Sequence, residues 1–554
     1  MTRIPGVTPG SFVVWRTILL LVLSLMSAGH ARAASGSDEA FAAAVAGLAT
    51  DDFAGKQAAV TAIAETRHAS ARMVLATLLD GKLYFRNSDN AVFLTDGGEA
   101  QLALTDPLTL KSAGQAPADA FTRITTNNSL RKLLRSAVAG FALAEPDAAV
   151  RLAAVREMSR SLDEDSVALL RAAVDAEKDA AVKQAMREGI ATADLGSDDA
   201  DTRLAAVRAL ENSLSLELAT KLSEMNTRAE DGSYPEPDER VRAAAAEVVK
   251  SIESSRRWYS TIETLFFGLS LGSVLVLCAI GLAITFGVMG VINMAHGELM
   301  MLGAYTTYVV QQAMPDHIGL SILVAIPLAF LVSACVGMLI ERGVVRWLYG
   351  RPLETLLATF GVSLILQQIV RDVFSANNRP VETPAWLAGS LQINEALSIT
   401  YNRLYVILFM LVVFAILLAV LQKTSLGLKV RAVAQNRNMA RAMGVRAQWV
   451  DAMTFGLGSG IAGVAGVALS QLTNVGPNLG QQYIIDSFMV VVFGGVGNLW
   501  GTLIGGMSLG VANKVLEPWA GAVLAKILVL VALILFIQRR PRGLFPQKGR
   551  AAEN

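Results

Sequence analysis

Three polar side chains interrupt a long apolar stretch in the second half of the 554-residue chain. Asn293, His296 and Glu298 lie between the apolar segments 265–289 and 299–312. A lipid bilayer accepts such groups only where protein or a water-filled cavity surrounds them. A broken or closely packed helix is permitted here by glycines at positions 287, 290, 297 and 303. Broken helices with polar groups at membrane depth commonly line a transport path, so the pattern predicts a membrane permease.

Each of these three residues also has a purely structural interpretation. Asn293 and His296 are equally suited to hydrogen bonds between helices. Glu298 needs a partner if it is buried, or it stays protonated, and a cap on the broken helix is the structural alternative to a substrate contact.

Composition places the chain among membrane proteins and excludes several other classes. It is 53% hydrophobic, its mean hydropathy is +0.45, and its net charge is only +1. A charge near zero gives no whole-chain argument for binding nucleic acid. Cys278 and Cys335 both lie in apolar runs, which is typical of core residues and not of a disulfide framework or a metal site. We expect neither a metal nor a cofactor.

The N-terminus has the pattern of a signal peptide. Arg3 precedes an apolar stretch from Phe12 to Met26, and the small-x-small sequence Ala31–Ala33 follows. We predict that residues 1–33 are the signal peptide, cleaved after Ala33. An uncleaved anchor is the alternative.

Residues 34–255 contain no apolar run of membrane length and have helical spacing of small apolar and charged residues. Similar segments begin at four aspartates, Asp147, Asp179, Asp199 and Asp238. An aspartate side chain suits the N-terminus of a helix. We therefore predict a HEAT-like helical-repeat domain, interrupted by a small hairpin at 82–94. No catalytic motif occurs here, so a structural or docking role is favoured over an enzymatic one.

From residue 256 to 545 the sequence predicts a polytopic α-helical transmembrane domain, followed by a cytoplasmic tail at 546–554. The apolar segments lie near 265–289, 294–312, 319–341, 355–371, 403–422, 449–470, 484–496, 500–514 and 521–537. Clusters of Lys and Arg follow the third, fifth and last of them and predict cytoplasmic loops. Counting back from the first of these cytoplasmic loops across three spans places residue 260 outside the cytoplasm. The predicted signal peptide places it on the same side. The repeat domain is therefore expected in the periplasm.

The loop 424–445 is basic and rich in alanine, and it predicts a helix followed by a second short helix that ends at Gly444. Ala432, Ala440 and Gly444 have the spacing that allows a partner to pack closely. We interpret this loop as a coupling helix for a nucleotide-binding subunit. Contact with anionic lipid is the alternative. The stretch Gly494–Gly501 permits a sharp reversal, and since it lacks the Lys-Ser/Thr ending it is not a phosphate-binding loop.

Residues 265–545 resemble the permease subunits of ATP-binding-cassette (ABC) importers for branched-chain amino acids and urea. The resemblance covers about half of the chain and rests on four segments together: 291–305, 427–444, 491–502 and 540–545. A long exported helical extension before the first span resembles the urea-type permeases within that family. The resemblance implies urea as substrate, with branched-chain amino acids or a short amide as the alternative.

The resemblance also implies the partners and the residues that serve them. The partners are ATP-binding subunits, a second permease subunit, a periplasmic substrate-binding protein and the lipid bilayer, and the chain itself is not an enzyme. ATPase coupling is assigned to Gly427, Arg431, Ala432, Ala440 and Gly444. Urea is neutral and carries four N–H donors and one acceptor, so its path needs uncharged hydrogen-bonding groups. The candidates for that path are Thr285, Asn293, His296, Glu298, Tyr305, Gln367, Gln368 and Asn474.

Three rival classes remain at the level of sequence. A secondary transporter or passive channel would need no coupling helix. An intramembrane hydrolase would use His296 and Glu298, but their spacing does not match a zinc-protease helix and no third ligand is evident. A receptor-like scaffold would use the repeats to bind a protein partner.

Overall fold

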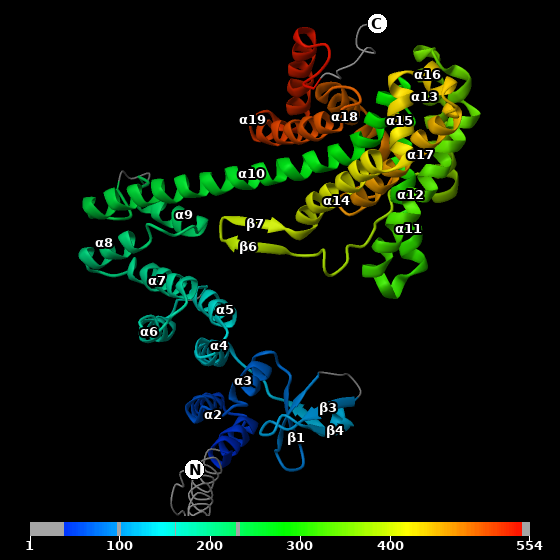
Figure 1. The fold of residues 1–554 in the computed structure, drawn as a ribbon. Coiled ribbons are helices and arrows are strands. Elements are labelled where there is room, and N and C mark those ends of the chain that lie inside the picture. The colour runs from blue at the N-terminus through cyan, green and yellow to red at the C-terminus, as the bar shows by residue number, and fades with distance from the viewer. Residues whose placement is uncertain (1–37, 97–100, 161, 229–232, 546–554) are drawn as a thin grey trace, which may run out of the picture. The chain divides into compact units, whose positions relative to one another are not determined.

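The computed structural model describes residues 38–96, 101–160, 162–228 and 233–545. The chain divides into two compact units, Met1–Ile252 and Glu253–Asn554 (Figure 1). The predicted signal peptide and the predicted tail at 546–554 lie outside the described residues.

The first unit contains an antiparallel sheet of five strands in the order β4-β3-β2-β1-β5. The predicted hairpin at 82–94 is confirmed, since its two runs pair as the first two strands. The other strands have shorter or more polar runs, and the sequence did not predict them. The strands are β1 (Leu83–Arg86), β2 (Val92–Thr95), β3 (Gln101–Thr105), β4 (Ser112–Pro117) and β5 (Phe121–Arg123).

Helices form the rest of the first unit. The first three share one core around Phe41, Ile63, Leu75 and Leu130. They are α2 (Phe53–Thr66), α3 (Ala71–Leu79) and α4 (Asn128–Leu143). Five more helices follow, namely α5 (Ala148–Ser159), α6 (Glu164–Ala173), α7 (Ala180–Asp194), α8 (Ala200–Ala209) and α9 (Leu216–Met225).

The acidic residues expected at helix starts are N-caps in the structure. Asp147, Asp179 and Asp199 each accept a hydrogen bond from a backbone N–H in the first turn of the helix that follows. Asp238 accepts the backbone N–H of Arg240 at 2.8 Å in the same way. A side-chain acceptor at this position satisfies one of the free donors of the first turn.

The second unit is formed mainly by helices, most of them apolar. They are α10 (Glu239–Met289, which begins in the first unit), α11 (His296–Ala313), α12 (Ile318–Gly343), α13 (Pro352–Phe374), α14 (Tyr401–Lys423), α15 (Ser425–Gln435), α16 (Arg437–Ala442), α17 (Ala447–Ser470), α18 (Leu479–Gly494) and α19 (Leu499–Arg539). A hairpin of β6 (Ser390–Asn394) and β7 (Leu397–Thr400) precedes α14.

Six helices of the described residues are long and apolar enough to cross a membrane: α10, α12, α13, α14, α17 and α19. This count is lower than the nine apolar segments of the sequence. Two of those segments lie on α19, on either side of a break at Gly521, where φ is 75°. The helix α18 has only 16 residues, and polar residues interrupt the apolar run of α11.

Glycines bring the helix backbones of the second unit into direct contact around α17, the most deeply buried of the six spans. A Cβ atom on Gly303 of α11 would overlap the carbonyl group of Gly463 on α17. A Cβ atom on Gly281 of α10 would overlap the carbonyl group of Gly458 in the same way. Small residues at such crossings allow the dispersion contacts that hold membrane helices together.

Candidate functional site

The predicted break between two apolar segments is present and positions the polar residues. The helix α10 ends at Met289, and α11 begins at His296. Gly290 has a φ of 66°, a conformation that glycine adopts without the strain of a Cβ atom. The polar side chains therefore lie at a discontinuity in the helix, inside the protein.

Glu298 forms the centre of a small buried cluster with α13. Its side chain is 1% exposed. One carboxyl oxygen, Oε1, accepts a hydrogen bond from Gln367 Nε2 at 2.7 Å and another from Ser363 Oγ at 3.0 Å. The other oxygen, Oε2, has no partner among the described residues. The cluster therefore leaves one buried carboxyl oxygen unsatisfied.

Asn293 and His296 also stabilise the break itself. Asn293 Oδ1 accepts the backbone N–H of Ala295 at 3.0 Å. His296 Nε2 lies 2.9 Å from the carbonyl oxygen of Cys278 on α10 and donates to it, because a carbonyl can only accept. Within the described part of the chain, Asn293 Nδ2 and His296 Nδ1 have no partner. Each residue thus combines a structural bond with a free polar atom.

Tyr305 faces the same neighbouring helix as Glu298. The two residues are seven positions apart on α11, which places them on one face two turns apart. The ring of Tyr305 packs on Phe374 of α13, with ring centroids 4.7 Å apart. Its hydroxyl has no partner among the residues that the structure describes. The interface between α11 and α13 therefore contains both the free carboxyl oxygen of Glu298 and the free hydroxyl of Tyr305.

The remaining path candidates lie elsewhere. Thr285 is buried, but its hydroxyl donates to the carbonyl oxygens of Gly281 and Leu282 on its own helix, at 3.3 and 3.1 Å. Gln368 is exposed and donates to Asp372 at 2.8 Å. Asn474 is exposed in the irregular connection after α17. These three do not join the cluster around Glu298.

Beside Gln367, two further polar residues of α13 line this region, Thr359 and Ser363, which the sequence analysis did not name. The three residues follow one another at four-residue spacing and are all buried. The hydroxyl of Thr359 accepts the backbone N–H of Met294 in the break at 3.1 Å. Residues four apart share one helix face, so this polar stripe was visible in the sequence as a helical pattern.

The basic loop forms the two predicted helices, α15 and α16. Gly427 is buried where α14 turns into α15, and a Cβ atom there would overlap Leu421. Arg431 Nη1 donates to the carbonyl oxygen of Leu421 at 2.7 Å, near the C-terminus of α14. These two residues fix the angle between the membrane helix and the loop.

The small residues of the loop differ in their exposure. Ala440 is buried in an apolar cluster with Val430, Val433, Ala447 and Val450. Ala432 is half-buried. Gly444 is exposed and has a φ of 85°. The large apolar side chains exposed on this loop are Leu428, Met439 and Met443, which the sequence analysis did not name.

An ion pair joins the loop to the membrane helices. Arg437 of α16 is paired with Asp451 of α17, whose side chain is fully buried. The guanidinium of Arg437 also lies over the ring of Tyr349, 4.7 Å from its centroid. The hydroxyl of Tyr349 donates to Glu341 of α12 at 3.4 Å. These contacts connect the loop to both α12 and α17.

Residues of the second unit match a known family of transport proteins. The model of the family described as branched-chain amino acid transport system, permease component, matches residues 264–537. This chain belongs to that permease family. Permease protein BraD of Pseudomonas aeruginosa is 30% identical over 296 residues, which are 52% of this chain and 96% of the relative. No solved structure matches the chain.

Two further relatives have the same extent. Permease protein LivH of Escherichia coli is 29% identical over 301 residues, which are 52% of this chain and 97% of the relative. The probable branched-chain amino acid permease LivH of Methanocaldococcus jannaschii is 25% identical over 288 residues, 49% of this chain and 88% of the relative. Nearly the whole length of these permeases therefore corresponds to about half of this chain, and residues 1–263 lie outside the family model.

Proposed function

We propose that this chain is the membrane-spanning subunit of an ABC importer and that its substrate is urea. The match of residues 264–537 to a permease family is the observation that carries the proposal. The buried cluster of Glu298, Ser363 and Gln367 supports it, because amide, hydroxyl and carboxyl groups can exchange hydrogen bonds with a small neutral solute. No positively charged side chain bonds to that cluster within the described residues.

The choice of urea rests on the first half of the chain. The relatives named for branched-chain amino acids match 52% of the chain, and the family model lies in its second half. An exported HEAT-like extension is what the chain shares with the urea-type permeases. Import of branched-chain amino acids is the second candidate, and the names of the relatives favour it.

Uptake measurements separate the two substrates. A strain that lacks only this chain is complemented with the wild-type protein, and initial uptake of labelled urea and labelled leucine is measured in each. Restoration of urea uptake alone supports the proposal. Restoration of leucine uptake alone overturns it in favour of the second candidate.

We further propose that α15 and α16 dock on an ATP-binding subunit. Leu428, Met439 and Met443 are exposed apolar side chains among lysines and arginines, and such side chains are suited to a protein partner. The aspartate substitution Met443→Asp should prevent co-purification of the ATPase and abolish uptake. If uptake survives loss of the ATPase, the chain is a secondary transporter or a channel.

The remaining partners and the topology are part of the same proposal. The first unit lies in the periplasm beside the substrate-binding protein, and a second permease subunit completes the membrane assembly. Single cysteines introduced at exposed positions of the first unit, such as Met73, test the topology. A membrane-impermeant thiol reagent should label them in intact spheroplasts. Labelling only after lysis contradicts the periplasmic assignment.

A further inference from the structure

The helices of the first unit repeat a short pattern, and no further copy follows the last one. In each copy, an acidic or polar residue precedes a capping aspartate by two positions, and a basic residue follows that aspartate by four. The four copies are Glu145–Arg151, Glu177–Lys183, Ser197–Arg203 and Glu236–Arg242.

Two arginines each bind the carboxylate of the following copy through the same two atoms. Arg151 donates to Glu177 from Nε at 2.8 Å and from Nη2 at 2.9 Å. Arg203 donates to Glu236 from Nε and from Nη2, both at 2.8 Å. Both pairs are largely shielded from solvent. A planar guanidinium matches a carboxylate in this two-point arrangement, which is stronger and more specific than a single ion pair.

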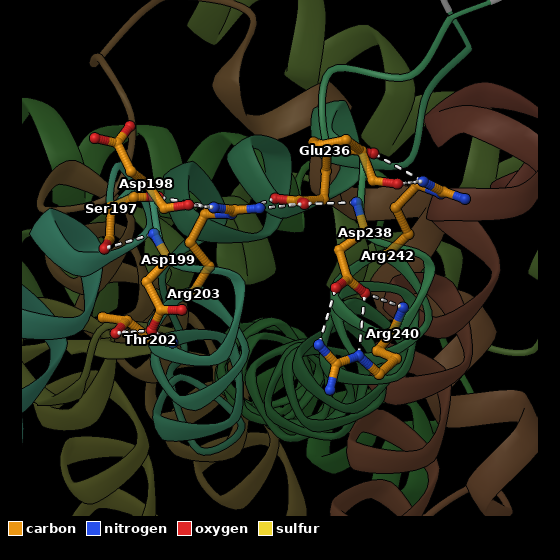
Figure 2. A network of polar contacts seen from close by, with 10 residues as sticks. Ser197, Asp198, Asp199, Thr202, Arg203, Glu236, Asp238, Arg240 and Arg242 are labelled. Carbon is orange, nitrogen blue, oxygen red and sulfur yellow. Dashed lines mark hydrogen bonds and ion pairs between the residues drawn. The ribbon is translucent and has the colours of Figure 1, made fainter.

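Backbone carbonyls fix the orientation of each guanidinium. Arg203 Nη1 donates to the carbonyl oxygens of Ser197 and Asp198 at 2.8 and 2.9 Å (Figure 2). Arg151 Nη1 makes the corresponding bonds to Glu145 and Pro146, both at 2.8 Å. The other edge of the guanidinium is thereby turned toward the next copy.

Arg242 has the same orientation but no next copy. Its Nη1 donates to the carbonyl oxygens of Glu236 and Pro237 at 2.8 and 2.9 Å, as Figure 2 shows. The ring of Tyr234 lies against it, 4.5 Å from the guanidinium carbon. No carboxylate of the described residues bonds to Nε or Nη2, because α10 continues into the second unit in place of another copy.

The two exceptions to the pattern affect the same pair of positions, the basic residue of one copy and the acidic residue of the next. The second copy has Lys183 in place of arginine, and the third copy has Ser197 in place of glutamate. Arginine is thus kept at the two positions that face a carboxylate and at Arg242. The outer surface of α10 beside Arg242 is formed by the exposed Ala243 and Ala246, which allow another helix to approach closely.

We infer that Arg242 is a docking position for a carboxylate of a partner protein, presented two residues before the capping aspartate of a helix. The expected partner motif is Glu-x-Asp at a helix start, because that motif fills the same position at Arg151 and at Arg203. This interaction is independent of the transported substrate.

A pair of labelled peptides tests the inference on the purified full-length protein in detergent. One peptide has the sequence of residues 234–256 and so carries Glu236 and Asp238, and its twin has the single change Glu236→Gln. Fluorescence anisotropy measures the dissociation constant of each. The glutamate peptide should bind about tenfold more tightly than its twin, since a two-point charged hydrogen bond is lost in the twin.

Variants of the protein test whether Arg242 is responsible for the preference for the glutamate peptide. Arg242→Gln should remove the difference between the two peptides, and Arg242→Lys should reduce it. Arg240→Gln should leave it unchanged, because Arg240 is an exposed arginine of the same helix that is already paired with Asp238. Thermal unfolding of each variant checks that the unit remains folded.

Three outcomes overturn the inference. The first is equal binding of the twin peptides to the wild-type protein. The second is a preference that survives Arg242→Gln in a folded variant. The third is a several-fold gain in peptide affinity when Glu230 and Asp231 are changed to Gln and Asn, because a carboxylate of this chain would then occupy the position.

Discussion

Glu298 differs from an isolated buried carboxyl group because both of its donors bind the same oxygen. Gln367 and Ser363 converge on Oε1 and leave Oε2 free. An unsatisfied buried acceptor is costly, so its free lone pairs favour a ligand that donates N–H groups. Urea carries such groups on both of its nitrogen atoms and an amino acid carries them on its ammonium group, so this oxygen can accept a donor from either candidate substrate.

Neighbouring glutamines offer a matched test of this site. We expect Gln367→Leu to lower the initial uptake rate about tenfold, since loss of one donor to a buried carboxyl group costs about 1–3 kcal/mol. Gln368→Leu should leave uptake within about twofold, because its side chain is exposed and binds only Asp372. Labelled-substrate uptake at equal protein levels measures both. Equal loss in the two variants would contradict a role for the cluster.

The sequence identified part of this site for a physical reason. Glu298 and Gln367 are large polar residues in apolar runs, so each stands out by itself. Ser363 and Thr359 are small and occur often in membrane helices, and only their spacing of four and eight residues from Gln367 indicates a shared face. Asn474 was misleading because it lies outside a helix, where spacing does not predict which way a side chain points.

At the scale of helices, packing of the second unit depends on glycine contacts. We expect Gly303→Leu to destabilise the protein by about 1–3 kcal/mol or more, because its side chain would force α11 away from α17. Gly361→Leu is the matched control, since nothing lies within 4 Å of a Cβ atom at that helical position. Thermal unfolding in detergent compares the two variants. A Gly303→Leu protein as stable as the control would show that α11 and α17 can separate freely.

The helices of the first unit are linked by ion pairs that acid should break. The hydrogen bond from Arg151 lowers the pKa of Glu177 from 4.5 to about 2, and the bond from Arg203 likewise lowers the pKa of Glu236. A carboxyl group with a lowered pKa contributes stability above its unfolded pKa, and this contribution is lost as pH falls through the folded pKa.

We therefore expect the first unit to lose stability as pH falls from about 4.5 toward 2. Hydrogen exchange of the amides of α5 and α7 at several pH values measures the change. Glu177→Gln should already be less protected at neutral pH and should depend less on pH in this range. An identical pH dependence in that variant would exclude the pair as the cause.

Sequence patterns predicted these helices better than the links between them. The capping aspartates are local signals, since each bonds to an N–H only two or three residues away. The Arg–Glu pairs join residues 26 and 33 positions apart, and the first of these spans an intervening helix. Strand β4 is mostly exposed and contains Gly114, so no apolar alternation marked it.

At the scale of the whole molecule, each unit has its own apolar cores. Phe41, Leu75 and Leu130 belong to a core of the first unit, and Leu299, Phe455 and Met410 belong to a core of the second. Relatives that consist almost entirely of the permease half correspond to the second unit. The membrane half should consequently fold without the residues that precede it.

Deletion of residues 35–250 tests this independence directly. We expect the shortened protein to insert into the membrane at a level similar to the wild type, because its α10 keeps the apolar residues 265–289, enough for one span. Its unfolding temperature in detergent should lie within a few degrees of the main transition of the full-length protein. Introducing Gly303→Leu into the shortened protein should lower its unfolding temperature, as in the full-length protein. A decrease in both proteins would show that the same contact between α11 and α17 is present in each. Aggregation or rapid degradation of the shortened protein alone would mean that the first unit is required for folding of the second.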